Sequence, residues 1–229
     1  QDETFGLTTR SAAFTLVPIA DTLDFGKNAK FRQFHLSAVA DSISYADPTQ
    51  QYILQNINVY ELDQPINWSK LNPEVNYTRK RITDGVPVYQ GSDSLSIDFS
   101  REFGEKYMGI TAADMDTITS YTKKFPGIFI TTNSPAGTGG RINIFRLPIS
   151  VSDGSIYGSY AELKFTADYG DRKQVDTSFL FYLGPMQLYD LGGVTSTSVT
   201  TYPQVAYDMT THSSSSLAGK AGKTVMLEG

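Results

Sequence analysis

Only two side chains of this sequence are ordinary bases near neutral pH, His35 and His212. Nucleophilic catalysis by a serine needs such a base beside the hydroxyl group. His35 alternates with apolar residues inside a strand-like segment, and His212 stands in a Ser-rich stretch. We therefore interpret both histidines as structural or solvated residues. Cysteine is absent, which excludes disulfides, thiolate catalysis and cysteine-ligated metals.

Carboxylates are the next candidates for chemistry. A glycosidase needs two carboxyl groups about 5 to 10 Å apart across a cleft. The sequence offers closely spaced acidic pairs, Asp93 with Asp98 and Glu102 with Glu105. Because any chain with 24 acidic residues contains such pairs, their spacing alone does not predict a catalytic site.

Three further aspartates, Asp153, Asp168 and Asp171, stand in turn-like segments where oxygen ligands could gather round Ca²⁺. They do not follow the EF-hand spacing, so a role in forming turns explains them better. The glycine-rich segment 137–140 lacks the Lys and Ser/Thr that follow the glycines of a phosphate-binding loop. We therefore predict no catalytic residue, no metal site and no cofactor.

Aromatic residues in a loop are the one feature that indicates binding. The segment 63–85 is rich in Pro and Asn and predicts a long loop that carries Trp68 and Tyr77. Flat aromatic rings stack on sugar or peptide faces, and loops on a rigid scaffold often carry function. Trp68 and Tyr77 are therefore the predicted ligand-binding residues. The alternative is that the single Trp fills the edge of the core.

Composition is typical of a globular β-protein. The 229 residues are 40% hydrophobic and 12% aromatic but only 19% charged, which supplies a core and favours strands over charged surface helices. The net charge of −5 and the scattered Lys and Arg residues argue against nucleic acid as a partner. No apolar run is long enough for a membrane-spanning helix. Since the sequence begins at Gln1 without Met, we expect that a leader has been removed.

Period-two alternation of apolar and polar residues predicts the strands. Segments 29–38 and 52–62 alternate in this way and predict strands with one wet face. Segment 11–23 is also strand-like, but Pro18 favours a sheet edge or a bulge there. Two short strands are expected at 86–89 and 95–99.

Helix signals cluster between residues 100 and 125. Ser100 is a predicted N-cap of a short helix that Gly109 ends. The clearest helix begins at Thr111, which forms an acidic capping box with Asp114, and Pro126 ends it. Its predicted apolar face consists of Met115, Ile118, Tyr121 and Phe125.

Two hairpins are predicted in the second half of the chain. Segments 127–132 and 141–147 are compact strands separated by turn-rich residues, and we expect them to pair. Segments 156–167 and 174–183 are long, β-branched and aromatic, with turn residues between them, and predict a second hairpin.

Together these elements predict a mainly β protein. The expected fold is one antiparallel β-sandwich domain over residues 1–229, jelly-roll-like, with one or two helices inserted around residues 100–125. From about residue 186 the chain becomes rich in Gly, Ser and Thr, so this C-terminal segment is the least defined part. Its last residues are apolar, and we expect the natural chain to continue past Gly229.

A family resemblance adds to this interpretation. The stretches that carry it are FGKNAKFRQFHLS (25–37), ILQNINVYEL (53–62), SLSIDFSREFGEKYMG (94–109), FPGIFITTN (125–133), GRINIFRLPIS (140–150) and KFTADYGDRKQVDTSFLFYL (164–183). Taken in order, they resemble a family of Bacteroidetes cell-envelope lipoproteins, domain of unknown function 4270. The resemblance implies export to the envelope and an N-terminal lipidated cysteine, which this chain lacks. The family has no established activity, so it implies no site residue. The order of elements is also similar to jelly-roll sandwiches common among carbohydrate-binding modules.

The predicted function is that of a non-enzymatic cell-surface lipoprotein domain that binds a glycan or an envelope protein. We expect it at the outer membrane, held there only by a lipid anchor absent from this chain. The first alternative is a structural or assembly subunit of the envelope without a small-molecule ligand, which an apolar patch or an exposed sheet edge would indicate. The second is a glycoside hydrolase, which two facing carboxylates, one with a raised pKa, would indicate.

Overall fold

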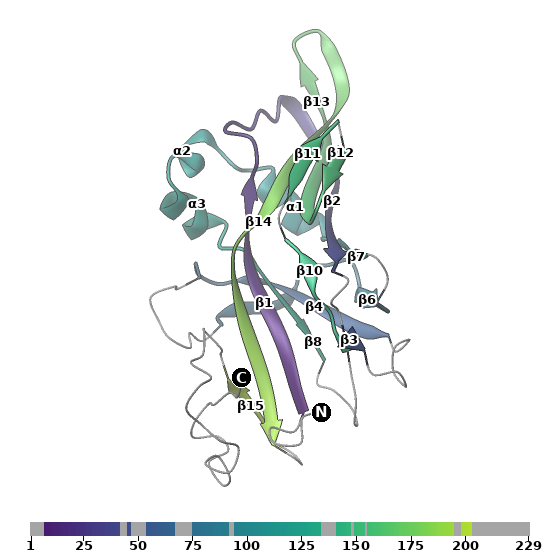
Figure 1. Cartoon of the computed structure of the whole chain (residues 1–229). Coiled ribbons are helices and arrows are strands. Elements are labelled where there is room, and N and C mark those ends of the chain that lie inside the picture. Colours follow the sequence, from purple (N-terminus) through teal and green to yellow (C-terminus); the bar gives the residue numbers. More distant parts are fainter. Residues whose placement is uncertain are drawn as a thin grey trace.

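The computed structural model describes residues 7–41, 45–46, 54–66, 75–91, 94–133, 141–147, 149–153, 155–194 and 198–202. Within these ranges the protein is mainly β, with one large antiparallel sheet, a sandwich-like arrangement and three short helices (Figure 1). The predicted fold class is therefore confirmed. No helix in the described ranges is both long and apolar enough to cross a membrane.

The large sheet contains most of the strands. Its members are β1 (Leu7–Pro18), β2 (Lys27–Ala40), β4 (Gln55–Leu62), β5 (Tyr77–Arg81), β6 (Val88–Tyr89), β7 (Ser94–Asp98), β8 (Ile128–Thr132), β10 (Phe145–Arg146), β13 (Tyr160–Tyr169), β14 (Arg172–Val194) and β15 (Ser198–Tyr202). Two small sheets pair β3 (Tyr45–Ala46) with β9 (Arg141–Ile142), and β11 (Ser150–Ser152) with β12 (Ser155–Tyr157).

The strand order of the large sheet is β10-β2-β13-β14-β1-β8-β4-β5, with β7 paired to β2, β6 to β4 and β15 to β14. Backbone contacts also join its two halves. Ile82 donates to the Val59 carbonyl of β4 at 3.0 Å, and Ser100, just after β7, donates to the Ile82 carbonyl at 2.8 Å. Thr83 and Phe99 form a bridge beside these bonds. The sheet therefore curls, and both halves enclose one core.

Aromatic rings fill the centre of this core. Phe34 is completely buried, and its ring centroid lies 5.0 to 5.9 Å from four other aromatic rings. These rings belong to Phe99, Phe103, Tyr107 and Phe181. They come from β2, β14, the end of β7 and the helix that follows it, so the cluster joins distant segments of the chain.

A bulge in β2 interrupts the predicted alternation. Gln33 pairs with Lys164 of β13, but the next pair is Phe31 with Phe165, so Arg32 is the extra residue. Because the bulge shifts the side-chain phase, Phe31 and Phe34 are both buried although they are three residues apart. Strict alternation placed these two phenylalanines on opposite faces, and that detail is wrong.

The predicted helices lie at α1 (Arg101–Tyr107), α2 (Ala112–Met115) and α3 (Ile118–Lys124). Ser100 caps α1 as predicted, since its side chain accepts from the Phe103 amide. The single helix predicted from Thr111 is instead two helices. Thr117 starts α3 as a new N-cap, accepting from the Ser120 amide at 3.0 Å. The break turns Ile118 outward, 57% exposed, so it does not lie on the predicted apolar face.

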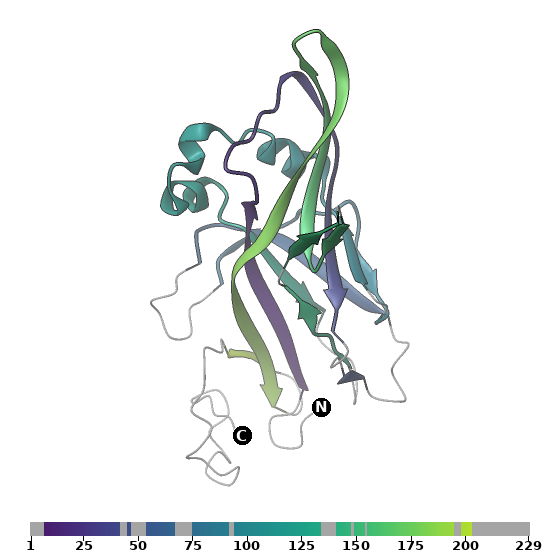
Figure 2. The same ribbon diagram turned by 45° about the horizontal axis from the view of Figure 1, so that its top comes forward.

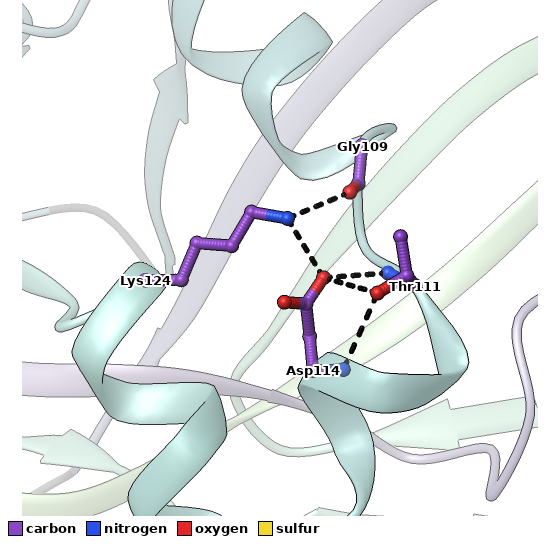
Figure 3. Close-up of polar contacts among 4 residues, drawn as sticks. All are labelled: Gly109, Thr111, Asp114 and Lys124. Atoms are coloured by element: carbon purple, nitrogen blue, oxygen red, sulfur yellow. Dashed lines mark hydrogen bonds and ion pairs between the residues drawn. The ribbon is translucent and has the colours of Figure 1, made fainter.

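One lysine holds α2 and α3 together (Figure 3). Lys124 Nζ lies 2.8 Å from Asp114 Oδ2 and 3.3 Å from the Gly109 carbonyl oxygen. Asp114 also accepts from the Thr111 amide at 2.8 Å, which completes the predicted capping box. Hydrogen bonds from Lys124 and Thr111 lower the pKa of Asp114 to about 2.

Pairing over long sequence distance differs from the predictions in two places. The hairpin of β13 and β14 is confirmed, with Asp168 to Asp171 at its turn. The predicted hairpin between 127–132 and 141–147 is wrong, because β8 pairs with β1 and β4 while β9 and β10 pair with β3 and β2. Ile128 and Phe129 are both buried, so both faces of β8 are covered there. The segment predicted as a loop at 63–85 contains β5, the outermost strand beside β4.

Pro18 and Pro185 lie where the pairing tolerates proline. Pro18 is the last residue of β1 and lies beyond the reach of β8, which pairs only with Ala12 to Phe14. Pro185 lies in a bulge of β14, where Phe14 pairs with Met186 and Leu16 with Leu183. The bulge allows β14 to continue past the predicted end of the strand.

Candidate binding face

The solvent side of β7, β2, β13 and β14 carries a continuous set of polar and aromatic side chains, which we call the outer face. Strand register arranges them in two adjacent rows across the sheet. One row is Asp98, His35, Glu162 and Leu180, and the next row is Ser96, Ser37, Tyr160 and Tyr182. In both views α1 lies behind β13 and β14 (Figures 1 and 2).

The opposite side of the same strands fixes this orientation. One row of completely buried side chains crosses the four strands, formed by Ile97, Leu36, Ala161 and Phe181. Because side chains alternate between the two faces of a strand, burial of this row forces the flanking residues outward. The core therefore positions the outer face.

His35 is the centre of a hydrogen-bonded group on the outer face. Its Nδ1 lies 2.8 Å from Asp98 Oδ1, and Gln33 Nε2 donates to the same oxygen at 2.7 Å. A carboxylate only accepts, so the imidazole carries its hydrogen on Nδ1. In the neutral ring Nε2 then accepts from the Ser96 hydroxyl, at 3.4 Å. The group is open to solvent, with the His35 side chain 26% and that of Asp98 54% exposed.

Asp98 is ionised through the neutral pH range. Burial raises its pKa, but the hydrogen bonds from His35 and Gln33 outweigh this effect, so the pKa lies below the ordinary value. An ionised carboxylate is a strong hydrogen-bond acceptor and a poor proton donor. Asp98 therefore suits the recognition of hydroxyl groups better than general acid catalysis.

Tyrosines occupy the other end of the outer face. Tyr160 and Tyr182 are direct cross-strand partners on β13 and β14, and Tyr182 is 37% exposed. Gly184 follows two residues later, where an added Cβ would lie 2.9 Å from Val17 and 3.6 Å from Tyr182. The added Cβ would also lie 2.9 Å from the Thr15 carbonyl oxygen, so the absence of a side chain at Gly184 lets β14 pass close to β1. Between the tyrosines and His35, Glu162 pairs with Lys164 at 3.2 Å.

Of the two predicted binding residues, only Tyr77 is described, and it lies away from the outer face. Trp68 falls outside the described residues. Tyr77 begins β5, half-buried, and its ring centroid lies 5.0 Å from the rings of both Tyr60 and Phe129. The ring of Tyr77 thus contributes to a small apolar cluster beneath β4 and β8.

The other candidates from the sequence are dispersed. Glu102 pairs with Lys80 at 2.6 Å and Glu105 with Arg101 at 3.3 Å, both at the surface. Asp168 accepts from Asn28 and from the Gln174 amide, which lower its pKa to about 2 and fix the β13–β14 turn. Asp93, His212 and segment 137–140 lie outside the described residues, while Asp153 and Asp171 lie in exposed turns. In the described ranges, no three His, Asp or Glu side chains gather as metal ligands.

Sequence reasoning placed His35 in a strand with one wet face but did not join it to Asp98, Ser96 or the tyrosines. Those contacts depend on the register between β7, β2 and β13, for which a single sequence carries no local signal. Comparison with family models, curated proteins and solved structures gave no match for this chain.

Proposed function

We propose that this domain is a non-enzymatic surface module that binds a glycan on its outer face. The observation that carries the proposal is the alignment of half-buried Tyr160 and exposed Tyr182 with the His35 group in adjacent rows. Tyrosine rings accept the apolar face of a sugar, while carboxylate, amide and imidazole groups bind its hydroxyls. A sheet face offers both kinds of contact at fixed spacing.

Binding fits this geometry better than catalysis. The order Ser96, His35, Asp98 matches the order that activates a serine, but the Ser96–His35 separation of 3.4 Å is long for a hydroxyl donor. Asp98 and Glu162 flank His35 as the two carboxylates that a glycoside hydrolase would need. Such an enzyme requires one carboxyl group with a raised pKa as the general acid, and the lowered pKa of Asp98 does not suit that role. Hydrolysis therefore stays the third candidate.

A glycan array tests the proposal with single-residue variants. Tyr182→Ala removes the exposed ring and Asp98→Asn removes the charge, and we expect each to lower capture of the best glycan at least fivefold. Tyr157→Ala removes another exposed tyrosine, 56% exposed on β12, and serves as control. Trp68→Ala tests the loop predicted from sequence. If only Trp68→Ala loses capture of the glycan, the binding site lies in that loop and not on the outer face.

The family resemblance supports a location for this activity. We propose that the full-length protein is a lipid-anchored component of the bacterial outer membrane, with this domain exposed on the cell surface. Metabolic labelling of the full-length protein with an alkyne fatty acid, followed by membrane fractionation, checks the anchor. Recovery of unlabelled protein in the soluble fraction would contradict it.

An apolar patch keeps the assembly subunit as the second candidate. Leu54, Val86 and Val88 are 60%, 43% and 54% exposed at the β4–β6 edge. Exposed apolar groups beside a short edge strand favour contact with another protein. Sedimentation of the wild type and of Val88→Lys distinguishes the two functions, since a glycan-binding monomer behaves alike in both.

A further inference from the structure

A basic depression lies where α1 packs beside the first half of β2. It has a volume of about 620 Å³ and is lined by residues 29–32 of β2 and by four residues of α1 and its C-terminal end. Those four residues are Arg101, Glu105, Met108 and Gly109. The depression is separate from the outer face, because β7 ends at Asp98, opposite His35.

Backbone geometry creates the depression. Residues 27–33 of β2 extend past the end of β7, so α1 lies along them in place of a strand. The close approach depends on Gly104, where an added Cβ would lie 2.0 Å from the Phe31 ring. Phe31 is 9% exposed and forms an apolar floor, and the Arg101 guanidinium lies 5.4 Å from its ring centroid.

The charges around this floor are unbalanced. Three cations, Lys30, Arg32 and Arg101, line the depression with one acid, Glu105. Glu105 pairs with Arg101 at 3.3 Å, and Lys30 and Arg32 have no ion-pair partner among the described residues. A positive concentration of this kind stands out in a chain with a net charge of −5.

We infer that this depression binds a tetrahedral oxyanion, the phosphate or sulfate group of a ligand. Guanidinium groups bind such oxygens in a bidentate fashion, and a lysine adds a mobile third charge. Arg32, the extra residue of the β2 bulge, is one of the residues that line the depression. The inference is independent of glycan binding on the outer face.

Titration with sodium pyrophosphate at low ionic strength, followed by NMR of the backbone and arginine Nε–H signals, tests the inference. We expect shifts at Lys30, Arg32 and Arg101, and weaker binding in Arg32→Gln by about fivefold, the factor for one unit charge at about 4 Å in water. Arg172→Gln removes another exposed charge, at the β13–β14 turn, and is the control.

Further arms identify the source of the anion. Glucose 6-phosphate represents a phosphorylated sugar, and vesicles containing phosphatidic acid represent a lipid headgroup. A ligand that binds the wild type and the control but loses affinity with Arg32→Gln supports the inference and names its source. Equal weakening by Arg32→Gln and Arg172→Gln, or no saturable binding of any of the three probes, would overturn it.

Discussion

Replacing Tyr107 with phenylalanine is expected to stabilise the protein. Tyr107 is completely buried, and its hydroxyl has no hydrogen-bond partner among the described residues. Burial also raises its pKa well above the ordinary value. A buried hydroxyl without a partner costs about 1 to 3 kcal/mol, whereas the phenylalanine ring keeps the contacts with Phe34 and Phe103 at 5.1 and 4.9 Å. We expect Tyr107→Phe to add about 1 to 2 kcal/mol to the free energy of unfolding.

Tyr121→Phe is the matched control, with the opposite sign. The Tyr121 hydroxyl donates to the Leu16 carbonyl at 2.6 Å in a buried position, so its removal leaves that carbonyl unpaired. We expect a loss of about 1 kcal/mol or more. Urea unfolding, monitored by tyrosine fluorescence and circular dichroism, measures the free energy of unfolding of both variants. In thermal unfolding, a gain of 1 kcal/mol corresponds to a rise in Tm of about 2 to 4 °C for a chain of this size. If Tyr107→Phe is destabilised as much as Tyr121→Phe, the Tyr107 hydroxyl has a partner and the reasoning fails.

Three more predictions concern the backbone and the carboxylates. Gly127→Ala should lower the free energy of unfolding by about 3 kcal/mol or more. The φ of Gly127, +120°, disfavours a side chain, and the new Cβ would lie 1.9 Å from the Phe14 carbonyl oxygen. Thermal denaturation measures the loss, and an unchanged Tm would contradict the prediction. In the folded protein the pKa values of Asp114 and Asp168 are lowered to about 2. At a pH above the pKa of these groups in the unfolded chain, their ionised carboxylates therefore stabilise the fold, and this contribution is lost as the pH falls from about 4 to 2. Urea unfolding at both pH values should show a smaller loss in the double variant Asp114→Asn, Asp168→Asn than in the wild type; an equal loss would place the acid sensitivity elsewhere. Glycan capture should weaken when acid protonates Asp98, and Asp98→Asn should lack this pH dependence; a wild-type profile in the variant would exclude Asp98 from the site.

Local signals in the sequence predicted local structure well. Ser100 and Thr111 cap helices as expected, since a capping side chain bonds to an amide only three residues away. The turn at Asp168 forms as expected for the same reason. Thr117 shows the limit, because it is also a good N-cap and the periodicity that crosses it concealed a break between two helices.

Long-range pairing could not be derived in the same way. The partners of β8 are β1 and β4. Segment 141–147, which the sequence predicted as the partner of β8, contains β9 and β10, and these strands pair with β3 and β2 instead. One bulge at Arg32 changes which residues of β2 face the core. For the binding face, alternation predicted that His35 lies in a strand with one wet face, but only the register brings Tyr160 and Asp98 into the rows beside it. Tyr77 looked like a loop aromatic because the strand that holds it is short and polar.

The outer face is tested most directly by NMR mapping of a glycan selected on the array. Binding there predicts that the largest amide shifts upon titration fall in β7, β2, β13 and β14, around His35 and Tyr182, and that Tyr182→Ala abolishes them. Shifts confined to other parts of the chain, with the signals of these four strands unchanged, would contradict the account.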